Sequence, residues 1–173
     1  MVKKLFTPLK PEDIEQFKIG DQVEINGIIY TGRDAVLPRI VKLINEGRIE
    51  SLGANLDGAV IFHSAVSVAG IGPTTSGKVE IESSIPILSS AGVRVHLGKG
   101  ALSPETVKAL EKYGSVYAVT APVTALLTSR VKSRRLIAFP EEGMEAFYEL
   151  KVEAFPAVIA IAHGKSVQIK GEG

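Results

Sequence analysis

The middle of the chain alternates short apolar runs with segments of helical pattern, and this order constrains the fold more than any other feature. Three apolar runs each precede a helix candidate: 59–62 before 76–91, 93–97 before 103–113, and 116–120 before 122–130. Strands joined through helices pair in parallel, because a crossover must return the chain to the same end of the sheet. The sequence therefore predicts an α/β fold with a mixed, partly parallel sheet.

The two ends of the chain are richer in strand patterns. We expect one domain over residues 1–173, because no linker long enough to divide the chain and no internal repeat is present. The remaining expected elements are a strand at 2–7, a helical turn at 11–17, a hairpin at 22–31, a helix at 34–46, strands at 136–139, 146–152 and 157–162, and a loose tail at 164–173.

Four residues support particular features of these elements. Asn26-Gly27 is a typical hairpin turn, so we place the bend of the 22–31 segment there. Asp34 is a good N-cap for the 34–46 helix, whose first turn tolerates Pro38. Pro86 is expected to kink or shorten the helix that contains it.

Composition excludes several classes of function. The 173 residues carry a net charge of +1, which gives no electrostatic basis for binding nucleic acid or an acidic membrane surface. The absence of cysteine excludes disulfides, thiolate zinc sites and any iron–sulfur cluster held by thiolates of this chain. Neither a secretory signal nor a membrane span is evident, so we expect a soluble cytoplasmic protein.

Three loops that follow expected strands each contain one cation. Arg33 lies in the loop 31–34, Lys78 ends the turn 72–78, and Lys99 lies in the loop 98–100. Ligands of open α/β sheets collect beyond the carboxyl ends of parallel strands. If the loops converge there, the three cations would suit a small dicarboxylate; otherwise each is an ordinary solvated side chain.

The turn Gly72-Pro73-Thr74-Thr75-Ser76-Gly77-Lys78 is the most informative of these loops. It places two threonine hydroxyls and a cation at an expected helix start, where unpaired backbone N–H groups favour an anion. Its glycine spacing differs from that of the nucleotide-binding loop. The two threonines are equally suited to capping a helix that binds nothing.

Other residue types offer no complete catalytic centre. The histidines His63, His96 and His163 lack the spacing of a metal pair on one helix, and we interpret His63 and His96 as satisfied structural residues. No strong acid, base or redox group stands out. This pattern, with anion-binding loops but no chemical centre, indicates half of an active site.

Four motifs in order carry a family resemblance: Thr31-Gly32-Arg33-Asp34-Ala35, the 72–78 turn, Gly98-Lys99-Gly100, and the segment 139–146. With them, the chain resembles the β subunit of two-subunit, iron–sulfur-dependent class I fumarases, or the similar L-tartrate dehydratase β subunit, over roughly residues 2–166. The resemblance implies a swivelling β/β/α domain. It also implies a cysteine-bearing α subunit as partner, which would carry a four-iron four-sulfur cluster whose open iron acts on the substrate as a Lewis acid.

The resemblance further implies an activity and residue roles. The activity is the reversible hydration of fumarate to L-malate by a hydro-lyase active only with its α subunit, in a heterotetramer of two pairs. Arg33 resembles the carboxylate-binding arginine of the family, and Lys99 resembles a lysine placed near a substrate carboxylate. Thr74 resembles the threonine that abstracts a proton, with Thr75 as an adjacent alternative. Lys78 stands where the family commonly has arginine, which keeps the charge and loses the bidentate fork.

Three alternatives stay open on the sequence. Tartrate is the rival substrate, because the motifs are shared between the two enzymes. The chain is otherwise a non-catalytic module that binds a small organic anion, or a structural domain whose loops bind nothing.

Overall fold

The computed structural model describes residues 2–64, 66–67, 70–71, 78–98, 101–120 and 124–166. Its helices are α1 (Pro11–Glu15), α2 (Leu37–Asn45), α3 (Lys78–Ser90), α4 (Pro104–Tyr113) and α5 (Thr124–Ser129), with 3₁₀ helices η1 (Ile49–Leu52) and η2 (Pro140–Glu145). Its strands are β1 (Val2–Phe6), β2 (Gln22–Thr31), β3 (Val60–Phe62), β4 (Val66–Ser67), β5 (Gly70–Ile71), β6 (Val95–Gly98), β7 (Val116–Val119), β8 (Val131–Ala138), β9 (Phe147–Ala162) and β10 (Lys165–Ser166). The mixed α/β class expected from the sequence is confirmed.

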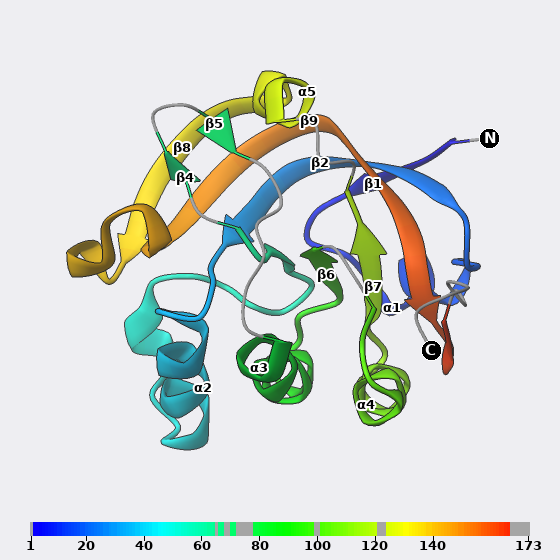
Figure 1. Ribbon diagram of the computed structural model, residues 1–173, viewed down its shortest axis with the longest axis horizontal. Coiled ribbons are helices and arrows are strands. Elements are labelled where there is room, and N and C mark those ends of the chain that lie inside the picture. Colours follow the sequence, from blue (N-terminus) through cyan, green and yellow to red (C-terminus); the bar gives the residue numbers. More distant parts are fainter. Residues whose placement is uncertain are drawn as a thin grey trace.

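The main sheet closes on itself. Its strands follow the order β1-β2-β3-β6-β7-β9-β10, and β2 also pairs antiparallel with β9, which joins β2, β3, β6, β7 and β9 into a ring. Within the ring, β2, β3, β6 and β7 run parallel to one another. Figure 1 shows β2 and β9 arching over the shorter parallel strands.

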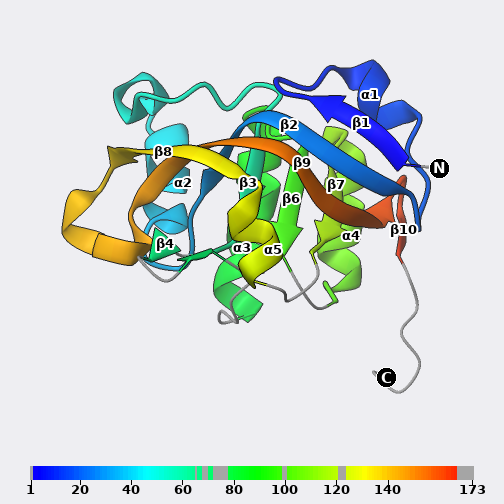
Figure 2. The same ribbon diagram turned by 90° about the horizontal axis from the view of Figure 1, so that it is seen from above.

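Helices cover the outer face of the parallel strands. Figures 1 and 2 show α2, α3 and α4 side by side along that face, with α5 on the opposite side beside β9. The parallel strands alternate accordingly: Val60 and Phe62 of β3 point into the ring, whereas Ile61 packs against the helix layer with Leu88 of α3. The ring interior is filled by apolar side chains, and Phe62 meets Phe155 edge to face at 5.5 Å between ring centroids.

The hairpin expected at Asn26-Gly27 is wrong, because residues 22–31 form the single strand β2. Asn26 lies instead at an irregularity where two residues of β9, Glu153 and Ala154, stand opposite one residue of β2. The Asn26 side chain accepts a hydrogen bond from Ala154 N (2.9 Å) and donates to Leu5 O (3.2 Å). The local turn chemistry thus makes a bulge, because β1 and β9 on either side hold the strand extended.

The two strands expected at 146–152 and 157–162 are one strand, β9. One edge of β9 pairs with β8 up to Val152 and with β7 from Val158 onward. Pro156 lies in the gap between these two partners, so its missing N–H removes no ladder hydrogen bond on that edge. The separate strand expected at 136–139 is likewise longer, because β8 begins at Val131.

The first turn of α2 also departs from the expectation. The helix begins at Leu37 with Val36 as its N-cap, so Asp34 is not the capping residue. A helix capped by Asp34 would need an N–H at Pro38 for its first hydrogen bond, which proline cannot supply. The carbonyl of Arg33 instead accepts from Val36 N and Leu37 N, at 3.1 and 2.9 Å, in a turn before the helix.

Two smaller expectations need correction, and one is confirmed. Pro86 does not shorten α3, which continues to Ser90 and holds the buried residues Ile85 and Leu88. Part of the expected tail, Lys165–Ser166, pairs with β9 as β10. Ser103 caps α4 as expected, accepting a hydrogen bond from Thr106 N.

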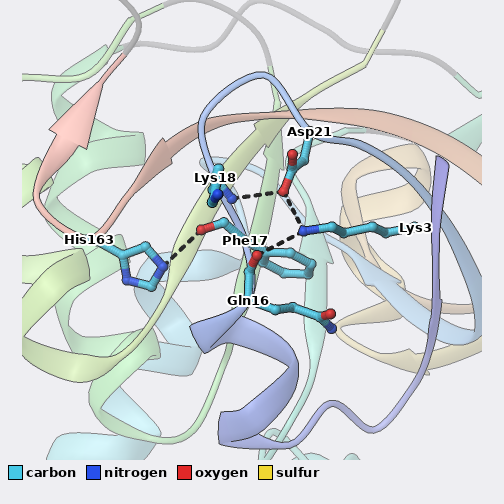
Figure 3. A network of polar contacts seen from close by, with 6 residues as sticks. All are labelled: Lys3, Gln16, Phe17, Lys18, Asp21 and His163. Carbon is cyan, nitrogen blue, oxygen red and sulfur yellow. Dashed lines mark hydrogen bonds and ion pairs between the residues drawn. The ribbon is translucent and has the colours of Figure 1, made fainter. Parts of the chain in front are cut away.

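A network of polar contacts fastens α1 to the strands (Figure 3). Lys3 Nζ of β1 donates to Gln16 O (2.7 Å) and to Asp21 Oδ2 (2.8 Å), and Asp21 Oδ2 also accepts from Lys18 N (2.8 Å). His163 Nε2, from the turn between β9 and β10, lies 2.9 Å from Phe17 O. The segment after α1 is therefore held from both ends of the chain.

Candidate active site

The carboxyl ends of β2, β3, β6 and β7 lie at one edge of the parallel part of the sheet. Arg33 follows β2, His63 follows β3, Lys99 follows β6 and Thr120 follows β7. Neighbouring strands lie about 5 Å apart, so the residues after β2, β3 and β6 start within reach of one small molecule. This edge is the candidate site.

Backbone hydrogen bonds between neighbouring strands continue beyond the last residues of β2, β3 and β7. Gly32 N donates to Phe62 O (3.1 Å), His63 N to Leu97 O (2.9 Å), and Thr120 N to Gly98 O (3.3 Å). The first residues of these loops are therefore fixed by the sheet. A site built on them is preorganised, which favours binding because little order remains to be imposed.

Glycine allows the Arg33 loop to pass close to α2. A Cβ added to Gly32 would lie 2.9 Å from Leu37 Cδ2 and 3.0 Å from Val36 Cγ2. A larger residue at position 32 would crowd the ends of these two side chains, which would have to shift. Gly32 thus lets the chain pass close to the start of α2 just before Arg33.

The amino end of α3 faces the same edge. This helix connects β3 to the parallel strand β6, so it runs antiparallel to both and begins near their carboxyl ends. It packs on the outer face of the sheet, where Ser89 Oγ lies 2.9 Å from His96 Nε2. Lys78 is its first residue.

Two of the five site residues predicted from the sequence can be placed. Arg33 lies two residues after Thr31, the last residue of β2, and the backbone of Lys78 begins α3, so both belong to this edge. Thr74, Thr75 and Lys99 lie outside the described residues, as does the side chain of Lys78. Gly98, the residue before Lys99, ends β6 at the same edge.

Buried polar residues at this edge were missed by the sequence interpretation. His63 is 2% exposed, and neither of its ring nitrogens has a hydrogen-bond partner among the described residues. Over the same residues, Thr31 Oγ1 and Thr120 Oγ1 are buried and lack partners. The available signal was a polar residue directly after an apolar strand. Among the described residues His63 is thus not a satisfied histidine, contrary to the sequence interpretation.

The buried histidines are neutral at physiological pH. Burial lowers the pKa of His63 to about 4, and burial with the nearby His63 lowers the pKa of His96 well below its usual value. Their ring centroids lie 5.7 Å apart. His96 is held by Ser89, as the sequence interpretation expected of a structural residue, although its Nδ1 has no partner in the described part of the chain.

A pocket of about 410 Å³ lies elsewhere, at the amino ends of β6 and β7. Its lining includes Arg94 and Ser115, which precede these strands, together with residues of both charges. Its cations Arg94 and Lys112 stand beside Glu15 and Glu111, and none of its described lining residues has a buried side-chain atom without a partner. The carboxyl edge remains the better candidate.

The described residues contain neither a candidate metal-binding group nor a membrane-spanning helix. No group of three or more histidine, aspartate and glutamate side chains among them could hold a metal ion. No helix in the same part of the chain is long and apolar enough to cross a membrane.

Comparison with known protein families shows to which family this chain belongs. The family model described as "Fumarase C-terminus" matches residues 3–170. The chain belongs to this fumarase C-terminal family. The resemblance noted from the four motifs is thereby confirmed.

Relatives within the fumarase C-terminal family have two kinds of name. A Methanocaldococcus jannaschii protein provisionally named L(+)-tartrate dehydratase subunit beta is 34% identical over 94% of this chain and 89% of its own length. The Escherichia coli L(+)-tartrate dehydratase subunit beta is 27% identical over 96% and 87%. The anaerobic class I fumarate hydratase of E. coli is 30% identical over 86% of this chain, but the match covers only 28% of that longer protein.

Proposed function

We propose that this chain is the β subunit of a two-subunit hydro-lyase that reversibly hydrates fumarate to L-malate, and that it supplies the dicarboxylate-binding half of the active site. The extent of the matches carries the β-subunit part of the proposal. The chain corresponds to nearly all of the proteins named as β subunits and to less than a third of a class I fumarate hydratase. The names of those relatives as β subunits imply a partner subunit, and in this proposal the partner supplies the rest of the enzyme.

The position of Arg33 after β2 and the start of α3 at Lys78 support a substrate site at the carboxyl edge, and the roles proposed for the individual residues follow the family resemblance. Arg33 would bind one carboxylate through its planar fork, and Lys78 and Lys99 would hold the other end of the diacid as point charges. Thr74 or Thr75 would remove the proton from the carbon next to a carboxylate. A neutral hydroxyl is a weak base, so this step needs nearby positive charge or transfer of the proton to a stronger base.

The residues of this chain do not fit an iron–sulfur cluster. The chain has no cysteine, and the described residues form no alternative group of metal ligands. We therefore assign the four-iron four-sulfur cluster expected from the family resemblance to a cysteine-bearing α subunit. The β chain would contribute substrate binding and proton handling only.

A second candidate is the β subunit of an L-tartrate dehydratase. It is favoured by the two relatives of that name, because they match this chain over almost their whole length. Both functions would use a small dicarboxylate and the same three proposed cations.

Turnover by the reconstituted enzyme tests the proposal. The chain, combined anaerobically with its α subunit, should hydrate fumarate to malate, whereas the chain alone should show neither iron nor activity. Faster turnover of L-tartrate than of fumarate or malate would select the second candidate. Hydratase activity in the isolated chain would contradict the division of the site between two subunits.

Substitution of each threonine tests which hydroxyl moves the proton. Thr74→Val should lower kcat strongly while leaving subunit pairing intact, because the proton acceptor is lost but the fold is not. Thr75→Val is the matched control, and kinetic constants for both variants give the answer. Near-normal turnover by Thr74→Val would remove Thr74 from the mechanism.

A further inference from the structure

We infer that His63 is a further substrate-binding residue, whose imidazole hydrogen-bonds an oxygen of the bound dicarboxylate. The inference builds on the proposed function and adds a residue at the same site. Three observations carry it: the strand that holds His63, its unpaired buried nitrogens, and the contrast with His96.

The strand of His63 lies between those that lead to the two proposed carboxylate-binding cations. β3 is bordered by β2, which leads to Arg33, and by β6, which leads to Lys99. The bond from His63 N to Leu97 O fixes its backbone against β6, while Phe62 O accepts from Gly32 N on the other side. A diacid held by both flanking cations would therefore cross the end of β3.

The ring of His63 also lies on the helix-facing side of the sheet. Its centroid is 5.7 Å from that of His96, whose Nε2 contacts Ser89 of α3. α3 covers this side and begins at Lys78 at the same edge. The imidazole therefore lies on the same face of the sheet as α3, whose first residue is Lys78, the third proposed cation.

Both ring nitrogens of His63 are buried without a partner among the described residues. Buried polar atoms in folded proteins are almost always hydrogen-bonded, because leaving one unpaired costs its full desolvation. His96, one strand further and deeper in the sheet, satisfies one nitrogen with Ser89. His96 Nδ1 lacks a partner among the same residues, but only the ring of His63, the histidine next to the candidate site, has both nitrogens unpaired, and a ligand there can supply the missing partners.

A neutral imidazole suits this position. Burial lowers the pKa of His63 to about 4, so at neutral pH the ring offers one N–H donor and one acceptor nitrogen without adding charge. The cations would neutralise the carboxylates, and His63 would orient the molecule by a directional bond.

Kinetics of the assembled enzyme provide the first test. His63→Leu should lower kcat/KM by about ten- to a hundredfold, the effect of losing a hydrogen bond to a charged group. His63→Gln, which can still donate and accept, should recover part of this loss. His96→Leu is the matched control, since it removes the neighbouring buried imidazole and should change kcat/KM less than threefold. Equal losses in His63→Leu and His96→Leu, or no loss in His63→Leu, would overturn the inference.

Thermal unfolding of the purified chain separates binding from a structural role. His63→Leu should keep or raise the melting temperature, because it removes an unpaired buried polar group. A clear fall would show that the imidazole supports the fold and would overturn the inference.

Binding of an unreactive diacid keeps the test independent of turnover. Succinate added to the assembled protein should shift the ring-nitrogen NMR signals of His63 more than those of His96 and His163. If the assembled protein turns over neither fumarate nor tartrate, the proposed function fails, while a selective shift still supports His63 as a diacid ligand. Unshifted His63 signals at saturating succinate would refute it.

Discussion

Arg33 depends on the residues on either side of it. Gly32 keeps the chain close to α2, and the carbonyl of Arg33 is held by Val36 N and Leu37 N. The backbone of this arginine is therefore fixed before any substrate arrives. Such preorganisation makes a single charged side chain more effective in binding an anion.

Replacement of Arg33 tests its proposed role. Arg33→Ala should weaken transition-state binding by about 2–4 kcal/mol, as expected for a lost charge-assisted contact in a desolvated site. The control is Arg39→Ala on the exposed side of α2, where Arg39 contacts Glu141 and Glu142. Steady-state kinetics of the assembled enzyme measure both, and similar constants for the two variants would contradict the role of Arg33.

Asp21 should make the stability of the chain depend on pH. Hydrogen bonds from the Lys3 side chain and from Lys18 N lower the pKa of this carboxyl below its ordinary 3.8. The unfolded chain therefore binds the proton first as the pH falls, so the stabilisation is present above pH 3.8 and is lost as pH drops through the lowered value. Asp21→Asn should reduce the melting temperature at pH 7.

The comparison for Asp21 is Glu12→Gln, the same change of charge on an exposed residue of α1. Thermal unfolding at pH 7 and near pH 2 should show the cost of Asp21→Asn shrinking in acid, when the wild-type carboxyl is also protonated. A cost that does not change with pH would assign the effect to packing.

Among the elements, the parallel strands and their helices were predicted best. Their patterns are local. Ser103 begins α4, and Gly114 ends it in the left-handed conformation. The short apolar runs of β3 and β7 form buried strands, as such runs predict. Asn26-Gly27 and Pro156 misled the prediction. Both are turn or breaker signals that a long strand tolerates when its neighbours supply partners or leave an edge open.

Substitution of Asn26 tests whether contacts with the neighbouring strands β1 and β9 stabilise β2. Asn26→Ala removes the bridge from β1 to β9 and leaves Ala154 N without its acceptor, so it should lower the free energy of unfolding by about 1–3 kcal/mol. Urea unfolding measures the change. Asn45→Ala, at the exposed end of α2, should alter stability by less than about 0.5 kcal/mol. Equal effects would mean that the bulge does not depend on this side chain.

The closed ring organises the whole molecule. Pairing of β2 with β9 joins segments more than a hundred residues apart and encloses one apolar core, while the helices enclose the outer face. The same closure buries His63 and His96 between sheet and helices. Their burial gives the folded molecule a second pH dependence.

Acid should destabilise the chain through its buried histidines. The unfolded chain protonates His63 near pH 6.5, but the folded chain keeps it neutral until about pH 4, so the unfolded state binds more protons in between. Stability should therefore fall as the pH drops from 6.5 toward 4, by at most about 1.4 kcal/mol per pH unit for this group. Urea unfolding at pH 7, 6 and 5 should show a shallower dependence for His63→Leu than for wild type.

The sequence by itself determined the α/β class, the helix ends marked by Ser103 and Gly114, and the identity of the cations that follow the strands. These features depend on local propensity, capping and motif order, which need no knowledge of distant residues. The tertiary structure alone decided that β2 and β9 stay continuous, that α2 begins at Leu37, and that His63 lacks a partner among the described residues. Each of these depends on what lies across the sheet or over its face, because hydrogen-bond partners and burial come from residues remote in sequence.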